Sequence, residues 1–187
     1  MSPPHDADLL TRSCRSTLAG WTGTDEEQER LRELFLSHLD EHGDGWRRTC
    51  PGAHLTASGL ICAPDEQQVL LTLHAKIGRW LQTGGHLDDD DAGLPAAALR
   101  ESREESGLAA LTLDPVPLLL SRHLVSCGGT PTYHLDVQYL VLAPRVVAPT
   151  LSEESLDLRW FKRADLPDGD DSVLELVEAA SARLDWT

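Results

Sequence analysis

Residues 84–108 read Gly-Gly-His-Leu-Asp-Asp-Asp-Asp-Ala-Gly-Leu-Pro-Ala-Ala-Ala-Leu-Arg-Glu-Ser-Arg-Glu-Glu-Ser-Gly-Leu, which places paired glycines and an acidic loop ahead of a glutamate-rich helix. Glu101, Glu104 and Glu105 share one face of that helix because they are spaced i, i+3 and i+4. A glutamate run is often only a solvated helix face. Three converging carboxylates, however, repel one another unless a hard divalent cation such as Mg²⁺ or Mn²⁺ neutralises them. The segment therefore predicts a metal-binding helix.

The remaining residues of this segment agree with a helix packed on a sheet. Ala98, Leu99 and Ser102 form a stripe on the face opposite the glutamates. Pro95 suits the first turn of a helix, and Gly107 suits its C-terminal cap. We therefore expect the helix to begin near Pro95 and to turn its glutamates away from the core.

The run Arg100–Leu108 resembles the Nudix box, Arg-Glu-apolar-x-Glu-Glu-x-Gly-apolar, of the Nudix hydrolases, and Gly85 corresponds to the leading glycine of that box. Two departures stand out. Ser102 occupies a position that is usually apolar, which we expect to cost a little stability rather than activity. The acidic loop is one residue longer than the common form and has Asp91 where the box has its first glutamate.

The resemblance covers roughly residues 54–167. The segment Trp80–His86 is similar to that of a bacterial Nudix subgroup with Trp-Leu-Gln-Pro-Gly-Gly-His before the acidic loop, and here Thr83 replaces the proline. The resemblance implies the α/β class, as an α/β/α sandwich whose mixed sheet lies between the Nudix helix and a C-terminal helix. An N-terminal helical extension, residues 1–50, precedes a Nudix domain, residues 51–187.

The resemblance also implies the residues of the site. One or more Mg²⁺ or Mn²⁺ ions would be bound by the carbonyl of Gly84 and by the box glutamates, Glu101, Glu104 and Glu105. Arg100 joins these glutamates in the catalytic set, where we expect a salt bridge to orient them. Neighbours at i−1 and i+2 face a helical residue poorly, so we do not expect Arg100 or Arg103 to pair well with Glu101.

Substrate phosphates need local positive charge or backbone donors. Arg79, Gly85 and His86 are the candidates for contacting them, with Lys76 as a further cation nearby in sequence. Arg103 is better explained as a surface residue in an ordinary ion pair. His86 is singled out because it directly follows the glycine pair, although a lone histidine is more often half-buried and hydrogen-bonded.

The implied reaction is metal-dependent cleavage of a diphosphate bond in a nucleoside diphosphate that is linked to another moiety. The general base stays open between Glu101 on the helix and an acid on a later loop, with Asp136, Glu153 and Glu154 as candidates. The alternative is a non-catalytic Nudix-fold domain that senses a nucleotide metabolite. Such domains tend to lose box glutamates, and this chain retains all three.

The charge composition of the chain limits the classes of molecule that it is expected to bind. With 31 acids against 16 bases, the net charge of −15 disfavours a nucleic-acid polymer and favours a small-molecule diphosphate. Neither a membrane segment nor a secretory signal is recognisable, so we expect a cytoplasmic protein whose four scattered cysteines are reduced. The N-terminal helices have apolar stripes that need a partner surface, and a homodimer contact is one possibility.

Hydrophobic periodicity predicts the other elements. Helices are expected over Asp6–Trp21 and Asp25–His42 and, at the end of the chain, over Ser172–Leu184. Strands are expected at His54–Cys62, Gln67–Leu73, Leu111–Val125, Thr132–Leu142 and Leu156–Phe161. The pair Gly84-Gly85 is expected to form a turn. Calcium-loop, dinucleotide, serine-hydrolase and zinc-helix motifs fail on spacing.

Overall fold

The computed structural model describes residues 6–127, 129–151, 155–167 and 171–186. Within them, eight strands form one mixed sheet: β1 (Ala53–Ala63), β2 (Gln68–His74), β3 (Trp80–Leu81), β4 (Thr83–His86), β5 (Thr112–Leu113), β6 (Leu119–Cys127), β7 (Thr130–Leu142) and β8 (Ser155–Lys162). The long β1 is central, because it pairs in parallel with β7 and antiparallel with both β2 and β4.

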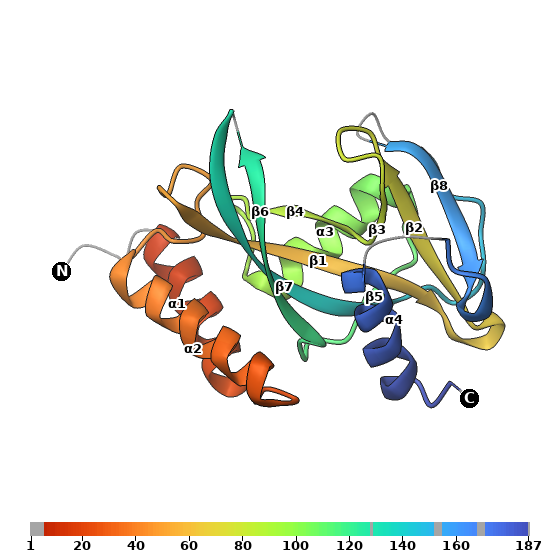
Figure 1. The fold of residues 1–187 in the computed structure, drawn as a ribbon, viewed down its shortest axis with the longest axis horizontal. Coiled ribbons are helices and arrows are strands. Elements are labelled where there is room, and N and C mark those ends of the chain that lie inside the picture. Colours follow the sequence, from red (N-terminus) through yellow and green to blue (C-terminus); the bar gives the residue numbers. More distant parts are fainter. Residues whose placement is uncertain (1–5, 128, 152–154, 168–170, 187) are drawn as a thin grey trace.

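In the described part of the chain, four helices flank this sheet: α1 (Asp6–Gly20), α2 (Glu26–Glu41), α3 (Leu94–Ser106) and α4 (Asp171–Arg183). Single 3-10 turns follow β1 and β8, at Pro64–Glu66 and Arg163–Asp165. Figure 1 shows α1 and α2 side by side at one end of the molecule and α4 near the other end. No helix among the described residues has the length and apolar character needed to span a membrane.

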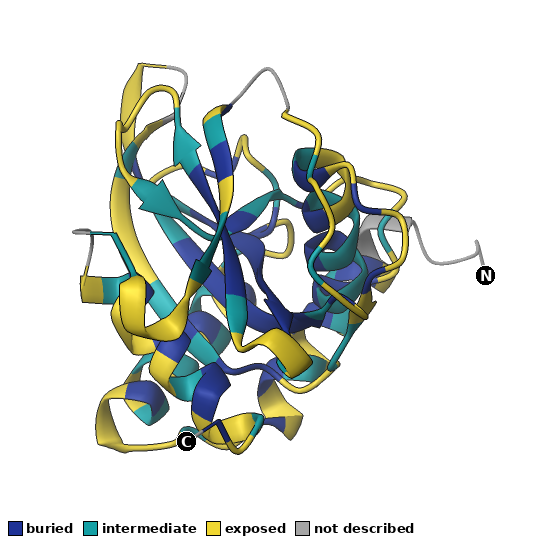
Figure 2. Ribbon diagram, turned by 90° about the vertical axis from the view of Figure 1, so that its right-hand side faces the viewer, coloured by how far each residue is buried: buried dark blue, intermediate teal, exposed yellow. Residues whose placement is uncertain are grey.

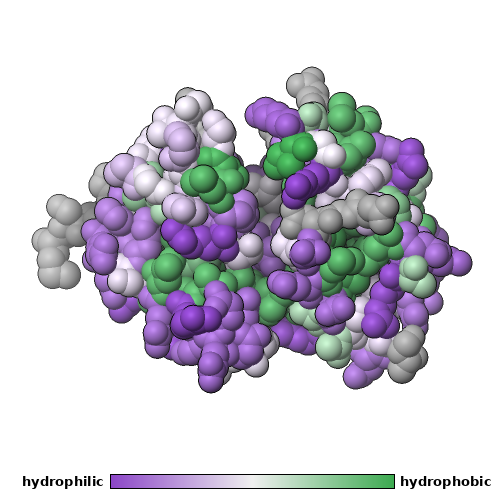
Figure 3. Space-filling model, viewed as in Figure 1, coloured by the Kyte–Doolittle hydropathy of each residue, from purple (hydrophilic) through white to green (hydrophobic). Residues whose placement is uncertain are grey.

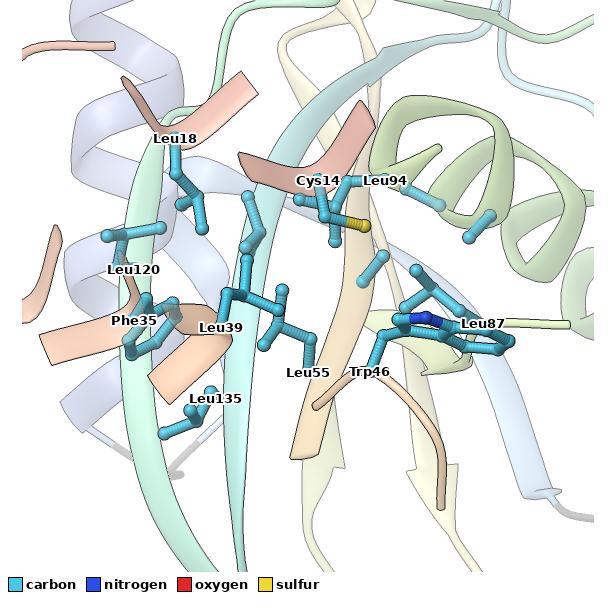
Figure 4. Packing of buried hydrophobic residues seen from close by; sticks show 14 of the residues in the cluster. Cys14, Leu18, Phe35, Leu39, Trp46, Leu55, Leu87, Leu94, Leu120 and Leu135 are labelled. Carbon is cyan, nitrogen blue, oxygen red and sulfur yellow. The ribbon is translucent and has the colours of Figure 1, made fainter. Parts of the chain in front are cut away.

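Strand alternation gives the sheet two different faces. Residues one apart on β1 and β7 point to opposite faces, and in the parallel pairing Leu55 lies beside Leu135. On this first face, Leu55 and Ala57 pack against α1, α2 and the first half of α3 (Figure 4). The first face is therefore apolar along its length and carries the Nudix helix, as the sequence predicts.

The second face changes character along β1. Leu60 and Cys62 pack beneath Val177 and its neighbours on α4, which completes the α/β/α sandwich. Towards the other end of the strand, the residues on this face are His54, Thr56 and Ser58, all of them buried. The burial pattern in Figure 2 follows this arrangement, with buried residues on the strands and on the inward sides of the helices.

The N-terminal helices share the core of the sheet. Asp25 caps α2 by accepting a hydrogen bond from the backbone N–H of Gln28 at 2.9 Å. The buried Gln28 amide then donates to the carbonyl of Leu120 on β6 and accepts from its N–H, at 3.1 and 2.7 Å. Because the sheet itself covers the apolar stripes of α1 and α2, their outward surface is mainly hydrophilic (Figure 3).

Two segments differ from the sequence-based expectation. The strand expected over 111–125 is divided into β5 and β6, because Pro115 and Pro117 lack the N–H groups that a continuous ladder requires. The Gly84-Gly85 pair is not a turn but part of β4, hydrogen-bonded along β1 opposite Ser58 and Ala57. Cys14, Cys50 and Cys62 are buried free thiols, as expected.

Candidate active site

The Nudix helix α3 is placed by small residues. It begins with Leu94 and Pro95 and ends at Gly107, whose φ of 68° is the left-handed conformation of a helix C-cap. Its inward face carries Ala98 and Ser102, both fully buried. A Cβ added to Gly59 of β1 would lie 2.5 Å from the hydroxyl of Ser102, so only glycine allows this close approach.

Two residues that depart from related sequences, Thr83 from the bacterial subgroup segment and Ser102 from the Nudix box, meet inside this contact. The hydroxyl of Thr83, on β4, donates to the carbonyl of Gly59 at 2.8 Å and lies 3.0 Å from the hydroxyl of Ser102. Since the Thr83 proton is used by the carbonyl, Ser102 is the donor between the two hydroxyls. A buried polar contact therefore links β4 to the Nudix helix where the subgroup has a proline and an apolar residue.

Strand β4 and the helix also meet at the first glutamate. A Cβ added to Gly85 would lie 2.7 to 2.8 Å from the carboxylate atoms of Glu101. The absence of a side chain at Gly85 therefore lets the carboxylate lie directly against the strand. Burial raises the pKa of Glu101, and the neighbouring Arg100 opposes that shift.

Arg100 joins the glutamates to the acidic loop. Its guanidinium donates to both carboxylate oxygens of Asp91, at 3.2 and 2.9 Å. It also donates to Glu101 at 2.9 Å, to Glu104 at 3.1 Å and to the carbonyl of His86 at 2.9 Å. The hydrogen bond to Asp91 is the largest cause of the raised pKa of Arg100.

The structure changes the sequence-based expectations for Arg100 and Arg103 and shows what Asp91 contacts. The consecutive residues Arg100 and Glu101 do pair, because the long guanidinium side chain reaches past the angle between neighbouring positions. Asp91, which the sequence places at the position of the first box glutamate, is the buried acceptor that anchors Arg100 to the loop; its side chain is 6% exposed. The expected surface ion pair of Arg103 is replaced by a hydrogen bond to the carbonyl of Leu111 at 3.0 Å.

These residues border an open cleft of about 490 Å³. Its lining comes from β4, the acidic loop, α3 and the segment before β1: Arg48, Gly84, Gly85, His86, Leu87, Asp88, Arg100, Glu101, Glu104 and Glu105. All three box glutamates and the glycine pair therefore face one space. A larger hollow of about 690 Å³, between β8 and α4, shares no lining residue with it.

The cations near the cleft are not all those that the sequence suggests. Lys76 and Arg79 lie exposed between β2 and β3 and are not among the cleft-lining residues. Arg48 lines the cleft instead, and the ion pair between Arg47 and Asp89, at 2.6 Å, holds its segment beside the acidic loop. Only the adjacent arginines at 47–48 hint at this role in the sequence.

The candidate bases are separated by the sheet. Asp136 is buried on the second face of β7, where it accepts hydrogen bonds from the hydroxyls of Thr56 at 2.9 Å and Ser58 at 2.6 Å. Glu101 instead lies over Gly85, whose partner on β1 is Ala57, a residue of the first face. The other two candidates, Glu153 and Glu154, lie outside the described residues.

Comparisons with known proteins agree with this geometry. The family model of the NUDIX domain matches residues 52–180. A NUDIX family hydrolase from Clostridium perfringens is 27% identical, with a TM-score of 0.51, over 71% of this chain and 96% of that one. A search of the curated proteins gave no significant match.

Two further solved structures share the fold. The NUDIX domain of Shewanella oneidensis NrtR complexed with ADP ribose is 24% identical, with a TM-score of 0.53, over 70% of this chain and 87% of that one. A C. elegans Ap4A hydrolase is 20% identical, with a TM-score of 0.52, over 71% of this chain and 98% of that one. With the family model matching well over half of the chain and the box residues gathered at one cleft, the protein belongs to the Nudix family and is a Nudix-type hydrolase.

Proposed function

We propose that this Nudix-type hydrolase cleaves the diphosphate bond of a nucleoside diphosphate linked to another moiety, with the help of Mg²⁺ or Mn²⁺. The observation that carries the proposal is the placement of the Glu101 carboxylate against Gly85, in a cleft that Glu104 and Glu105 also line. Carboxylates gathered around a bare glycine backbone leave room for a hard cation together with phosphate oxygens.

The donor set fits such an ion. Glu101, Glu104, Glu105 and the carbonyl of Gly84 would hold it, because all four offer the oxygen ligands that Mg²⁺ and Mn²⁺ prefer. When bound, the ion supplies the positive charge that stabilises the departing phosphate and makes a water molecule more acidic. Arg100 holds Glu101 and Glu104 in place from the side of the acidic loop.

We assign the proton-accepting role to Glu101. Its Oε1 accepts the hydrogen bond from Arg100, which leaves Oε2 to take the proton of the attacking water. The hydrogen bonds of Asp136 to Thr56 and Ser58 direct both of its oxygens along the second face of the sheet, which makes it the weaker candidate.

Substrate contacts are assigned to the cleft lining. Arg48 supplies a cation for the diphosphate in a protein whose net charge is −15, while Gly85 and the backbone of His86 border the phosphates. Arg79, outside the cleft lining, is the matched comparison. We expect Arg48→Ala to raise KM about 10-fold, the cost of one charge-assisted hydrogen bond, and Arg79→Ala to leave KM unchanged. An equal effect of both variants would remove Arg48 from the substrate site.

The second candidate function is binding of a nucleotide metabolite without cleavage. The NUDIX domain from Shewanella oneidensis, which has the same fold, was solved with ADP ribose bound, so ligand recognition is the feature that favours this alternative. The retained glutamates favour hydrolysis, because recognition alone does not require a cation-binding cluster at the cleft.

A substrate panel tests both functions. Nucleoside triphosphates, ADP-ribose, nucleotide sugars, dinucleoside polyphosphates and coenzyme A would each be incubated with the protein in Mg²⁺, in Mn²⁺ and in excess chelator. We expect product from at least one nucleoside diphosphate derivative with either ion and none with chelator. Undiminished turnover in chelator would reject the metal role, and tight binding without product from any compound would establish the binding function instead.

A further inference from the structure

Three histidines from three different strands converge on the second face of the sheet. His54 on β1, His86 at the end of β4 and His134 on β7 each offer a ring nitrogen, and these three atoms lie within 4.8 Å of one another. Among the described residues, this is the one group of three or more potential ligands that meets so closely. The sequence separates these histidines widely, so their convergence is a product of the sheet.

Strand register explains the convergence. His54 and His134 are direct partners in the parallel pairing of β1 with β7, so their side chains stand on the same face. His86 pairs with Thr56, two residues along β1 on that face. The ring centroids are 4.8 Å apart between His54 and His134, and 5.0 and 5.1 Å from these to His86.

Strand β4 contributes residues to both faces of the sheet. On β4, Gly85 meets the carboxylate of Glu101 on the first face, and the next residue, His86, turns its ring towards His54 and His134 on the second. The carbonyl of His86 accepts from Arg100, so the backbone of this residue belongs to the cleft while its ring belongs to the histidine cluster. The ring of His86 therefore lies on the opposite face from the Glu101 carboxylate, although the residue itself also lines the cleft.

Burial leaves ring nitrogens of this cluster without hydrogen-bond partners. His54 is fully buried, and neither of its ring nitrogens has a partner; Nε2 of His134 is also buried without one. Buried polar atoms normally have hydrogen-bond partners. Ring nitrogens that have none, in a group that converges on one point, are therefore suited to bind an ion. Burial also lowers the pKa of His54 to about 4 and that of His134 to about 3, which keeps both rings neutral and able to donate lone pairs.

We infer that His54, His86 and His134 form a binding site for a borderline divalent transition-metal ion of the Zn²⁺ class. Three neutral imidazoles suit Zn²⁺, Co²⁺ or Ni²⁺, whereas Mg²⁺ requires oxygen ligands. Zn–N bonds of about 2.0–2.1 Å in a tetrahedral arrangement would bring the three nitrogens to roughly 3.3 Å apart, which small ring rotations achieve from the observed spacing. The fourth position is left for water or another ligand.

Besides His38 on α2, two neighbouring side chains bear on this site. His123 on β6 is the direct partner of His134, with ring centroids 5.5 Å apart, so it borders the site without belonging to the group of three. Arg48 opposes a bound cation electrostatically, but its side chain is exposed, so that water weakens the repulsion. No carboxylate belongs to the cluster, which favours imidazole-binding ions over Mg²⁺.

Metal titration of the whole chain tests the site. His42→Ala would be built into every variant, because His38 and His42 also lie together, with ring centroids 4.9 Å apart, and could bind the same ions. Saturating Mg²⁺ would occupy the carboxylates while Zn²⁺ binding is followed by calorimetry. Co²⁺ binding would be followed in parallel by its visible absorption, which reports tetrahedral nitrogen ligation. We expect one Zn²⁺ per chain at this site and an intense Co²⁺ spectrum.

Single-histidine variants identify the ligands. His86→Ala and His134→Asn should each weaken Zn²⁺ binding by more than about 100-fold, since even groups that only support ligands cost about 10- to 100-fold. His74→Ala, which changes a histidine outside the cluster, is the control and should bind like its parent. Far-UV circular dichroism would show that the His86 variant, whose side chain is only half-buried, remains folded.

The outcomes separate this site from the proposed hydrolase site. Equal Zn²⁺ affinity in the parent and in both ligand variants, or a weak octahedral Co²⁺ spectrum, would overturn the inference. Glu104→Gln, which alters the Nudix helix on the other face, should leave the Co²⁺ spectrum unchanged. Because the readout uses the metal alone, the absence of any hydrolysed substrate would leave the result intact.

Discussion

The polar side chains on the two sides of strand β4 have opposite surroundings. On the first face, Glu101 is ion-paired with Arg100 and borders an open cleft. On the second, His54 is fully buried and its ring nitrogens have no partner. A permanent cation helps to keep a carboxylate charged, whereas burial without a partner keeps an imidazole neutral. Strand β4 thereby separates the carboxylate oxygens of α3 on one side from the neutral ring nitrogens of the histidine cluster on the other.

The largest expected effect comes from the charge of Glu101. Glu101→Gln keeps the shape of the side chain but removes the proton acceptor, so we expect kcat to fall about 10²- to 10⁴-fold with little change in substrate affinity. Single-turnover rates in saturating Mg²⁺ would be measured together with the melting temperature. A large loss of stability with an unchanged chemical step would assign Glu101 to the structure of the helix.

We expect Glu104 and Glu105 to affect the rate by binding the metal ion rather than by accepting a proton. Glu104→Gln and Glu105→Gln each remove a charged ligand, and we expect each to lower the rate on the order of 10²-fold, with partial recovery at raised Mg²⁺. Rates across a Mg²⁺ titration measure this. Near-normal rates in both variants would make them ordinary surface glutamates.

A methyl group added at Gly85 on β4 should change the glutamate site but not the histidine cluster. Gly85→Ala places a Cβ within 2.7 to 2.8 Å of the Glu101 carboxylate, the far end of a flexible side chain, so the carboxylate moves and the fold remains. Displacement of a reacting group by about 1 Å can cost about 100-fold, and we expect a loss of about 10- to 100-fold in kcat. The melting temperature and Zn²⁺ binding should not change; a loss of both would show that the faces are mechanically coupled.

Acid should lower the stability of the folded protein through the buried histidines of the second face. The pKa values of His54 and His134 lie near 4 and 3 in the folded, metal-free protein, against about 6.5 in an unfolded chain, and burial is the first cause. The unfolded chain therefore binds protons first, and folding stability falls as the pH drops through about 6.5 towards 4. In chelator, the melting temperature should drop by several degrees between pH 7 and pH 5. The His54→Asn, His134→Asn double variant should lose less over that range, and equal losses would contradict the assignment.

The smallest effect is expected at the contact between the two hydroxyls. Thr83→Val and Ser102→Ala each leave a buried hydroxyl with one partner fewer, at a cost of about 1 kcal/mol in the free energy of unfolding. Because both variants break the same contact, the double variant should cost less than the sum, with a coupling of about 0.5–1 kcal/mol by denaturant unfolding. Strict additivity would show that the departures at positions 83 and 102 are independent.

Much of the fold followed from local patterns. Helical spacing and cap residues located α1, α2, α3 and α4 to within a few residues, because these signals lie within one or two turns of chain. The division of 111–125 into β5 and β6 was missed, although Pro115 and Pro117 are a local signal for it. The pairing of the Gly84-Gly85 segment with β1 had no local signal, since strand pairing depends on a distant partner.

The residues of the candidate site were likewise predictable only where a local pattern specified them. Spacing along one helix was sufficient to place Glu101, Glu104 and Glu105 at a common cleft, whereas Arg48 reached that cleft through a distant ion pair between Arg47 and Asp89. The family resemblance left Asp136 among the candidate bases. Its position on the other face became evident only from the register of β7 with β1.

The sequence by itself determined the Nudix helix and the common face of its three glutamates, because both depend on periodicity within a short stretch of chain, and its resemblance to the Nudix family implied the α/β class. Only the tertiary structure decided that Gly85 faces Glu101, that Thr83 contacts Ser102 and that three histidines meet behind β4. Those contacts depend on strand register, and a shift of one residue would exchange the two faces of the sheet. Register is set by burial of the whole core, which no local segment specifies.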